Sequence, residues 1–278
     1  MVRTAFMGAH RRIQAYGDIG DILGSGGTAY AMIPIGDQDH ENAGRTTVTT
    51  VGAGAGDGLV FTYSEAIQDF DTSLFYRHNQ LWLPDAPFNG TDEEADSPDA
   101  AFWTRNDGAS EGLSIGAWLN ITDTAGIRII LSKWDDDQAV QEWLFFVRAN
   151  DTLRLLVRDD SVPTTADRTS DGAILQGQLA FFVVTYDGSG GSSAMDGVTL
   201  YQNGVVLAST ATNSGTYVAM ENGTSTVGLG ARFNATSAKQ QFFDGRILGG
   251  PVGPFFTQQE LTAAQVAELY RIGVAAQG

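Results

Sequence analysis

The sequence predicts an all-β protein, a sandwich or barrel of antiparallel strands, and two observations lead to this fold class. Short runs such as Leu113–Leu119 alternate apolar and polar residues with a period of two, which is typical of strands that bury one face. Turn residues, mainly Gly, Asn and Asp, separate these runs at intervals of about 8–12 residues. A chain of 278 residues, of which 42% are hydrophobic, is also long enough to bury a large core.

The first 60 residues differ from the rest of the chain. Gly is frequent between residues 17 and 58, and the two strand candidates there, Ala29–Ile35 and Thr46–Val51, are too short to form a core of their own. We therefore expect residues 1–60 to form an extended, Gly-rich N-terminal arm and residues 61–278 to form the β domain.

The beginning of this arm is basic. Arg3, Arg11 and Arg12 lie within the first twelve residues, which contain no Asp or Glu. Such a segment is suited to an acidic protein surface. We expect it to act as an assembly arm that docks on other subunits of a homo-oligomer or larger assembly.

Beyond the arm, short apolar runs are bounded by turn residues. Asn203-Gly204 between two such runs is a strong hairpin signal, because both residues tolerate the positive φ angles of a type I′ turn. Residues 186–197 are polar and rich in Gly and Ser, so we expect an exposed loop there. The predicted strands are Leu59–Tyr63, Leu81–Leu83, Ala101–Arg105, Leu113–Ile121, Ile127–Lys133, Trp143–Ala149, Leu153–Arg158, Gln178–Tyr186, Val198–Gln202, Val205–Ser209, Ser225–Gly230 and Gln241–Leu248.

One short helix is predicted near the C-terminus. Thr262 and Gln265 have the spacing of a capping box, in which each side chain bonds the backbone of the other. Residues 263–272 favour a helix and carry an apolar stripe. Gly273 is suited to end that helix.

Composition excludes several classes of function. The chain has 33 Asp and Glu against 16 Lys and Arg, a net charge of −17, which disfavours nucleic acids and anionic membranes as partners. It has no Cys, so disulfides, thiolate metal sites and Cys nucleophiles are excluded. No apolar run approaches the roughly 20 residues of a membrane span. The basic start is not followed by the apolar stretch of a secretory signal.

Six segments, taken together and in order, resemble the laminin G-like or concanavalin A-like jelly-roll family over residues of about 72–277. Residues 112–119 (GLSIGAWL) are similar to the family's FTISAWV strand, and residues 179–188 (LAFFVVTYDG) to its WHHVAVTYDG strand. The resemblance implies a two-sheet antiparallel jelly-roll sandwich, and it does not cover residues 1–60. The other similar segments are 130–134 (ILSKW), 198–208 (VTLYQNGVVLA), 243–247 (FDGRI) and 261–270 (LTAAQVAELY).

Two segments depart from the family pattern, and the first is Ala180-Phe181, where the family usually has Trp-His. After Ile247 the chain reads LGGPVGP, where the family continues with a regular strand. Two Pro and three Gly in seven residues predict a reshaped strand or a loop.

The sequence shows no convincing catalytic constellation. Relatives of this fold that cleave polysaccharides use two closely spaced carboxyls, and their common signature E-x-D-x-x-E does not occur. The nearest acidic run, Asp92–Asp96, lies between Gly90 and Pro98 and is expected to be a solvated loop. Only three His are present and G-x-S-x-G is absent, so a nucleophilic triad is not expected.

Two kinds of ligand remain open. The resemblance implies calcium at the rim of some members, bound by Asp residues of the loops; a solvated turn is the alternative for such residues here. Sugars stack on aromatic rings, so a rim Trp next to these acids could bind carbohydrate, although burial in the core is the commoner fate of Trp. The candidate ligand-binding residues are Trp134, Trp143, Asp135, Asp137, Asp159 and Asp160.

We therefore expect a non-enzymatic structural or adhesive protein of a larger assembly, such as a decoration or fibre-type protein on the surface of a virion (a phage capsid). The alternative is a stand-alone, extracellular, lectin-like module that binds carbohydrate, with or without calcium. A glycoside hydrolase or lyase is a third hypothesis. The position of residues 1–60 separates the first two, because an arm that crosses onto other chains indicates assembly and an arm that folds back indicates an independent binder.

Overall fold

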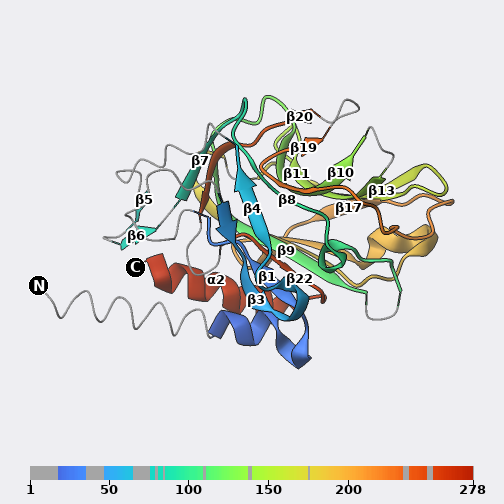
Figure 1. The fold of residues 1–278 in the computed structure, drawn as a ribbon, viewed down its shortest axis with the longest axis horizontal. Coiled ribbons are helices and arrows are strands. Elements are labelled where there is room, and N and C mark those ends of the chain that lie inside the picture. The colour runs from blue at the N-terminus through green and yellow to red at the C-terminus, as the bar shows by residue number, and fades with distance from the viewer. Residues whose placement is uncertain are drawn as a thin grey trace, which may run out of the picture.

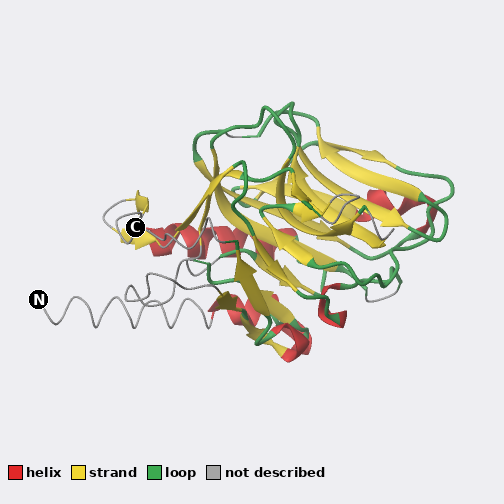
Figure 2. Ribbon diagram, turned by 45° about the horizontal axis from the view of Figure 1, so that its top comes forward, coloured by secondary structure: helices red, strands yellow, loops and turns green. Residues whose placement is uncertain are grey.

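Two antiparallel β-sheets stack face to face, and a helix covers one of them (Figures 1 and 2). This confirms the predicted jelly-roll sandwich with a C-terminal helix. The computed structural model describes residues 18–35, 47–64, 76–78, 81–83, 85–108, 111–136, 140–174, 176–233, 238–248 and 253–277.

The first sheet, named here the helix-covered sheet, is built around β9 (Leu113–Ile121). Its strands follow the order β16 (Val205–Val206), β15 (Val198–Gln202), β14 (Leu179–Tyr186), β9, β22 (Phe255–Thr257), β1 (Tyr30–Met32) and β3 (Val51–Ala53), with β21 (Asp244–Leu248) beside β9 and β7 (Asp85–Asn89) beside β21.

The second sheet, named here the open sheet, is built around the long hairpin of β10 (Arg128–Asp135) and β11 (Val140–Val147). Its strands follow the order β17 (Ser209–Thr212), β13 (Thr164–Ser170), β12 (Leu153–Asp159), β11, β10, β18 (Val227–Leu229), β8 (Ala95–Ser97), β4 (Val60–Tyr63) and β2 (Thr47–Thr49), with β19 (Arg232–Phe233) beside β10 and β20 (Lys239–Gln240) beside β19.

The remaining elements are short, apart from one helix. A separate two-stranded ribbon pairs β5 with β6, and a helical turn spans residues 18–23. The bounds are β5 (Tyr76–His78), β6 (Leu81–Leu83), η1 (Ser25–Gly27), η2 (Gly54–Gly56), η4 (Ala101–Trp103), η5 (Gly191–Gly197) and α2 (Ala263–Gln277).

The strand that was predicted to be reshaped after Ile247 is interrupted. β21 pairs with the end of β9, where Gly245 lies opposite Ile121, and β22 pairs with its start, where Phe255 lies opposite Gly116. The two strands therefore form one interrupted line along a single edge of β9, and the Gly- and Pro-rich segment separates them. β22 also pairs with β1, which joins the C-terminal and N-terminal parts of the chain.

Between the sheets, an aromatic cluster surrounds β22. The ring of Phe256 lies 5.3 Å from Phe102, 5.4 Å from Trp103 and 5.5 Å from Trp143, centroid to centroid. All four side chains are at most 2% exposed. Because aromatic rings bury large apolar areas, this cluster is a major part of the core.

The helix α2 packs on the outer face of the helix-covered sheet (Figure 1). Tyr270 stacks on Trp118 at 5.5 Å, and the predicted capping box forms between Thr262 and Gln265. The helix continues through Gly273, so the prediction that this residue ends it is wrong. A Cβ at Gly273 would collide with the Trp118 indole, so Gly allows the close approach. None of the helices in the described ranges has the length and apolar character of a membrane span.

The described parts of residues 1–60 lie within the sandwich. β1 and β3 belong to the helix-covered sheet, and β2 pairs with β4 in the open sheet. Ala31, Ile33 and Val48 are buried in the main core. This part of the chain is folded back rather than extended away from the domain, because its alternate apolar side chains complete both sheets. Residues 1–17 lie outside the described residues, so the assembly arm stays a prediction.

Several local predictions can be compared with the structure. Asn203 and Gly204 have φ angles of 53° and 77° and join β15 to β16, which confirms the hairpin. The predicted strand Ala101–Arg105 is wrong, since it begins with η4. Phe102 and Trp103 are adjacent, and both rings contact Phe256 in one core cluster, so they do not point to opposite faces as they would in a strand.

Three polar segments are more structured than predicted. The run Asp92–Asp96 is not a solvated loop, because Glu94 and Ala95 are buried and β8 begins there. The loop at 186–197 contains η5, which buries Ala194 and Met195. β13 was not predicted, since its sequence TTADRTS contains only one apolar residue.

Phe256→Ala should lower the free energy of unfolding by about 3–5 kcal/mol, because it leaves a cavity among three rings. Urea denaturation followed by Trp fluorescence measures this change. Val205→Ala, at a side chain that is 67% exposed, is the control and should change the free energy by less than about 0.5 kcal/mol. A loss below about 1 kcal/mol for Phe256→Ala would contradict the central position of β22.

Candidate ligand-binding face

The outer face of the open sheet carries the candidate site. Side chains alternate along strands, so those next to core residues of β10–β13 and β17 point away from the core. Ile129, Trp134, Leu144 and Phe146 form a separate apolar cluster there. In Figure 1 β19 and β20 lie beside β10 at the upper edge of the sandwich. We name the outward side chains of β11, β12, β13 and β17 the open face.

A polar network forms around Trp134 at the end of the β10–β11 hairpin. The Trp134 indole N–H and the Gln141 amide donate to the same Oδ1 atom of Asp136, both at 2.6 Å. Arg232, at the start of β19, pairs with the other oxygen. Although burial opposes the effect, hydrogen bonds from Arg232 and Trp134 keep the pKa of Asp136 below its ordinary value. Asp136 is therefore an ionised carboxylate that fixes the indole and ties β19 to the hairpin.

Pairs of Arg and Asp continue across the open face. Arg158 donates to Asp160 at 2.7 Å, and Asp160 also accepts the backbone N–H of Gln141 at 2.7 Å. Arg154 pairs with Asp167 and lies over the ring of Phe146, 5.8 Å from its centroid. The hydroxyls of exposed or half-exposed Thr lie beside these pairs on β13 and β17: Thr165, Thr169, Thr210 and Thr212. Each guanidinium is matched by a carboxylate, so the face offers many hydrogen-bonding groups with little net charge.

The structure brings together part of the predicted site. Trp134 and Asp160 both contact Gln141 or its partner Asp136, as described above. The Trp134 ring is only 6% exposed and belongs to a buried cluster, so the prediction that it offers a free face to a sugar is wrong. Asp135 ends β10 opposite Val140, at the same hairpin. Asp137 lies outside the described residues.

Trp143 is not a rim residue, because its indole is fully buried and its N–H donates to the carbonyl of Trp103 at 3.1 Å. Asp159 is also buried, at 1% exposure. Its carboxylate accepts from the N–H groups of Val162 and Val218, so it holds two loops together.

Three residues of the network were not predicted. Gln141 and Arg232 carry no local signal in the sequence, because they meet Asp136 only through the hairpin pairing and through the return of the chain after β18. Arg158 lies two residues before Asp160 in the sequence, so the spacing of these two opposite charges was the available signal for that pair. The register of β10 with β11, which places Trp134 opposite Gln141, would have pointed to Gln141.

The described Asp residues do not fit a calcium site. Calcium needs six to eight oxygen ligands, mostly carboxylates and carbonyls that are free to bind it. Asp136 and Asp160 already pair with Arg232 and Arg158, and Asp159 accepts four donors. Among the described residues, no group of three or more Asp, Glu or His side chains is arranged to hold a metal ion.

A buried ion cluster lies on the inner side of the same hairpin. Lys133 is fully buried and pairs with Glu142 and, at 2.9 Å, with Asp99. Glu142 also accepts the N–H of Gly223 at 2.9 Å. One lysine faces two carboxylates, so one negative charge in the cluster has no cation of its own. Water can stabilise the charge of the partly exposed Asp99, whereas Glu142 is buried, so the cost of the excess negative charge falls on Glu142. Burial raises the pKa of Glu142 to about 7 although Lys133 opposes the shift.

Lys239 is a second lysine that is shared by two carboxylates. It pairs with Asp96 at 2.6 Å and with Glu94, and it holds β20 against β8. The side chain of Glu94 is 1% exposed, and burial raises its pKa to about 7, with Lys239 again opposing the shift.

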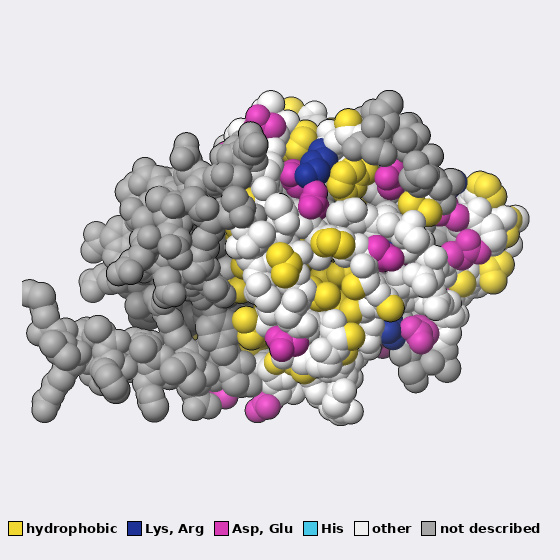
Figure 3. Space-filling model, viewed as in Figure 1, with side chains coloured by type: hydrophobic (Ala, Val, Ile, Leu, Met, Phe, Trp, Pro, Cys, Tyr) yellow, Lys and Arg dark blue, Asp and Glu magenta, His cyan; other side chains and the backbone are white. Residues whose placement is uncertain are grey.

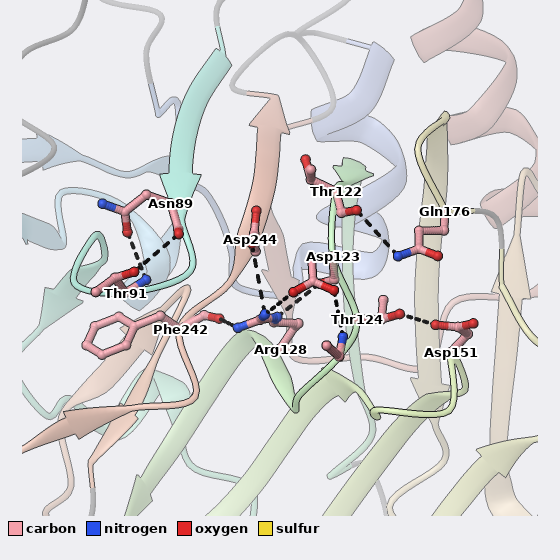
Figure 4. Close-up of polar contacts among 11 residues, drawn as sticks. Asn89, Thr91, Thr122, Asp123, Thr124, Arg128, Asp151, Gln176, Phe242 and Asp244 are labelled. Carbon is pink, nitrogen blue, oxygen red and sulfur yellow. Dashed lines mark hydrogen bonds and ion pairs between the residues drawn. The ribbon is translucent and has the colours of Figure 1, made fainter.

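At the far end of β10, Arg128 closes a different set of loops (Figure 4). Its guanidinium donates to Asp123 at 2.8 Å and to the carbonyl of Phe242 at 3.1 Å, and it lies 3.9 Å from Asp244. A hydrogen bond from Thr124 to Asp151 joins the next loop. These groups use one another as partners, so this cluster is a structural tie between loops.

The surface in Figure 3 shows the acidic character of the chain directly. Asp and Glu side chains are spread over this side of the molecule, whereas Lys and Arg appear in only a few places. The Arg side chains of the open sheet that are described above are each paired with an Asp, on a chain whose net charge is strongly negative.

The fold and this face can now be compared with known proteins. A laminin G family model, described as the concanavalin A-like lectin/glucanases superfamily, matches residues 89–249. The chain belongs to this superfamily. The match includes both halves of the β10–β11 hairpin and most of the open face. No curated protein matches the chain by sequence.

Solved structures of the same fold are toxin binding domains. The binding domain of botulinum neurotoxin serotype D superposes with a TM-score of 0.57 at 10% identity, covering 94% of this chain and 53% of that chain. The serotype G domain gives 0.53 at 12% identity, with 81% and 48% covered. The binding domain of neurotoxin DC, in complex with rat synaptotagmin II, gives 0.54 at 10% identity, with 88% and 51% covered. The chain thus spans about half the length of these domains.

Calcium and chelator should have no effect on stability. The melting temperature of the protein should be the same in excess calcium and in EDTA, because no group of three or more Asp, Glu or His side chains among the described residues is arranged to hold a metal ion. Differential scanning fluorimetry measures this. A rise of several degrees that depends on calcium concentration would contradict the prediction.

The protein should be more stable at pH 5.5 than at pH 8. The pKa values of Glu94 and Glu142 are raised in the folded state, so their stabilising effect is complete below the pKa of the unfolded chain and is lost as the pH rises through about 7. The expected gain on acidification is on the order of 1 kcal/mol for each carboxyl.

Urea denaturation at the two pH values measures this gain. Glu142→Gln should reduce the difference between pH 5.5 and pH 8, because the amide does not titrate, and Glu268→Gln on the exposed side of α2 should leave it unchanged. A wild-type protein that is less stable at pH 5.5 would show that the buried carboxyls are ionised.

Proposed function

We propose that the chain is a non-catalytic binding module that takes a neutral glycan on its open face. The observation that carries this proposal is the row of paired Arg and Asp groups with Thr hydroxyls beside the Trp134 network. Neutral sugars present many hydroxyls, which need planar donors and acceptors at fixed positions, together with apolar contact for the ring faces. The paired guanidiniums and carboxylates supply both kinds of group.

The covering of the other sheet supports the choice of face. α2 and the N-terminal helical turn pack on the outer face of the helix-covered sheet, where Trp118, Phe181 and Tyr201 are buried. On the open sheet, Thr165, Thr210 and Thr212 are exposed among the described residues, so this side of the sandwich is the one that an extended ligand can reach. The membership in a superfamily of lectins and glucanases, and the likeness to toxin binding domains, fit a binding role.

A protein ligand is the second candidate. One of the similar domains is seen in complex with a protein, rat synaptotagmin II. The same open face would then bind a polar protein surface. A place on the surface of a virion or outside a cell, as part of a larger assembly, stays a prediction from the sequence.

Blocking the open face should weaken glycan binding. Thr165→Trp and Thr212→Trp each place a bulky ring at an exposed position on β13 or β17, and binding should weaken at least about tenfold without a change in melting temperature. An array of neutral oligosaccharides identifies a ligand, and isothermal titration calorimetry measures its affinity for each variant.

Ala264→Trp is the matched control, because Ala264 is exposed on α2 at the covered side of the sandwich. It should bind like the wild type. Silence of the whole array with wild-type protein would overturn the glycan proposal. Product release from a polysaccharide panel would show instead that the module is an enzyme.

A further inference from the structure

Two exposed valines lie together at one end of the sandwich. Val162, in the turn between β12 and β13, is 40% exposed, and Val218, in the segment between β17 and β18, is 62% exposed. The buried carboxylate of Asp159 accepts the N–H of Val162 at 3.1 Å and that of Val218 at 3.0 Å. We name these two side chains the valine rim. In Figure 1 both loops reach the right-hand end of the molecule.

The backbone of the valine rim is held firmly. The carbonyl of Val218 accepts the N–H of Gly191 at 2.7 Å. On either side of Val218, Asp107 accepts the hydroxyl of Tyr217 at 2.5 Å and the N–H of Met220 at 3.2 Å. Singly exposed apolar residues are common on surfaces, but here two loops are fixed so that their valines are exposed together. A rigid apolar surface loses little entropy when a partner covers it.

Exposed acidic side chains lie on the segments next to the valine rim. Asp187 and Asp196 are exposed on the loop that contains η5, and Glu221 is exposed three residues after Val218. No ion pair is seen for these three carboxylates within the described residues. At the right-hand end of Figure 3, hydrophobic side chains lie beside acidic ones. The surface therefore fits a partner segment that is both basic and apolar, and it disfavours anionic lipid.

The chain itself contains such a segment. Residues 1–17 (MVRTAFMGAHRRIQAYG) carry Arg3, Arg11 and Arg12 and no carboxylate, and their apolar side chains include Val2, Phe6 and Ile13. The described chain begins at the helical turn 18–23, which Figure 1 shows below the sandwich near α2, away from the valine rim. Because this helical turn lies away from the valine rim of the same chain, we take the rim of a second copy as the docking surface.

We propose that residues 1–17 of one copy dock on the valine rim of a second copy. The arginines face the carboxylates of Asp187, Asp196 and Glu221, and the apolar side chains cover Val162 and Val218. This contact joins two different surfaces, so it is heterologous and produces rings or longer chains rather than a simple two-fold dimer. It is independent of glycan binding on the open face.

Self-association of the full-length chain tests the proposal. Sedimentation velocity over a range of protein concentrations should show wild-type oligomers that weaken as salt is raised, because the contact includes exposed charges. The double variant Val162→Ser/Val218→Ser should self-associate at least about tenfold more weakly. The control Val205→Ser/Val206→Ser removes two valines that are 67% and 54% exposed on β16, and it should behave like the wild type.

Charge reversal identifies the partner segment. Arg11→Glu/Arg12→Glu should abolish self-association, and a mixture of this variant with Asp196→Lys/Glu221→Lys should restore a complex, because each chain then supplies the complement of the other. The proposal is overturned if the wild type is monomeric at all concentrations. It is also overturned if the β16 control weakens association as much as the rim variant, if the mixed variants fail to associate, or if cross-links between residues 1–17 and the rim form within a monomer.

Discussion

The packing of β22 between β9 and β1 is the constraint on which the rest of this structure depends. Phe256 places one strand in the centre of the aromatic core, and the same strand bonds the N-terminal β1 on its other edge. The chain leaves β22 directly for α2, so the helix must lie on the outer side of this sheet. The N-terminal helical turn joins the same layer, where Ile19 and Leu23 are buried. One face of the sandwich is closed by this arrangement, which is why we place the proposed ligand on the opposite sheet.

Ion pairing explains how an acidic chain stabilises that opposite sheet. Lys133 and Lys239 are each shared by two carboxylates, one buried and one partly exposed, and both tie a neighbouring segment to the sheet. Removing one partner of such a cluster leaves a buried charge, which costs more than the pair itself contributes. The Arg–Asp pairs on the outer face form a second set of ion pairs on the same sheet.

Sequence patterns predicted the elements that depend on local chemistry. The alternation in β9, the Asn203-Gly204 turn and the capping box at Thr262 are all set by neighbouring residues, and the structure shows each of them. β13 and β8 were missed because their sequences are polar and their burial comes from contacts with distant strands. Gly273 looked like a helix end, but its small size serves packing against Trp118, which is 155 residues away in the sequence.

The candidate site likewise contains residues that the sequence predicted and residues that only the fold brings together. Trp134 and the acids after it were visible as an aromatic residue next to charges at a strand end. Their partners Arg232 and Gln141 were not, since only the return of the chain after β18 and the register of the hairpin bring them close. Trp143 was assigned to the rim from its neighbours Gln141 and Glu142, but a bulge in the pairing between Lys133 and Trp134 turns it inward. Hydrogen–deuterium exchange of the full-length protein, with and without a bound ligand, tests the central claim most directly. Protection of β11, β12, β13 and β17 is the result expected for a ligand on the open face, whereas protection confined to α2 or to the loops around Arg128 would contradict it.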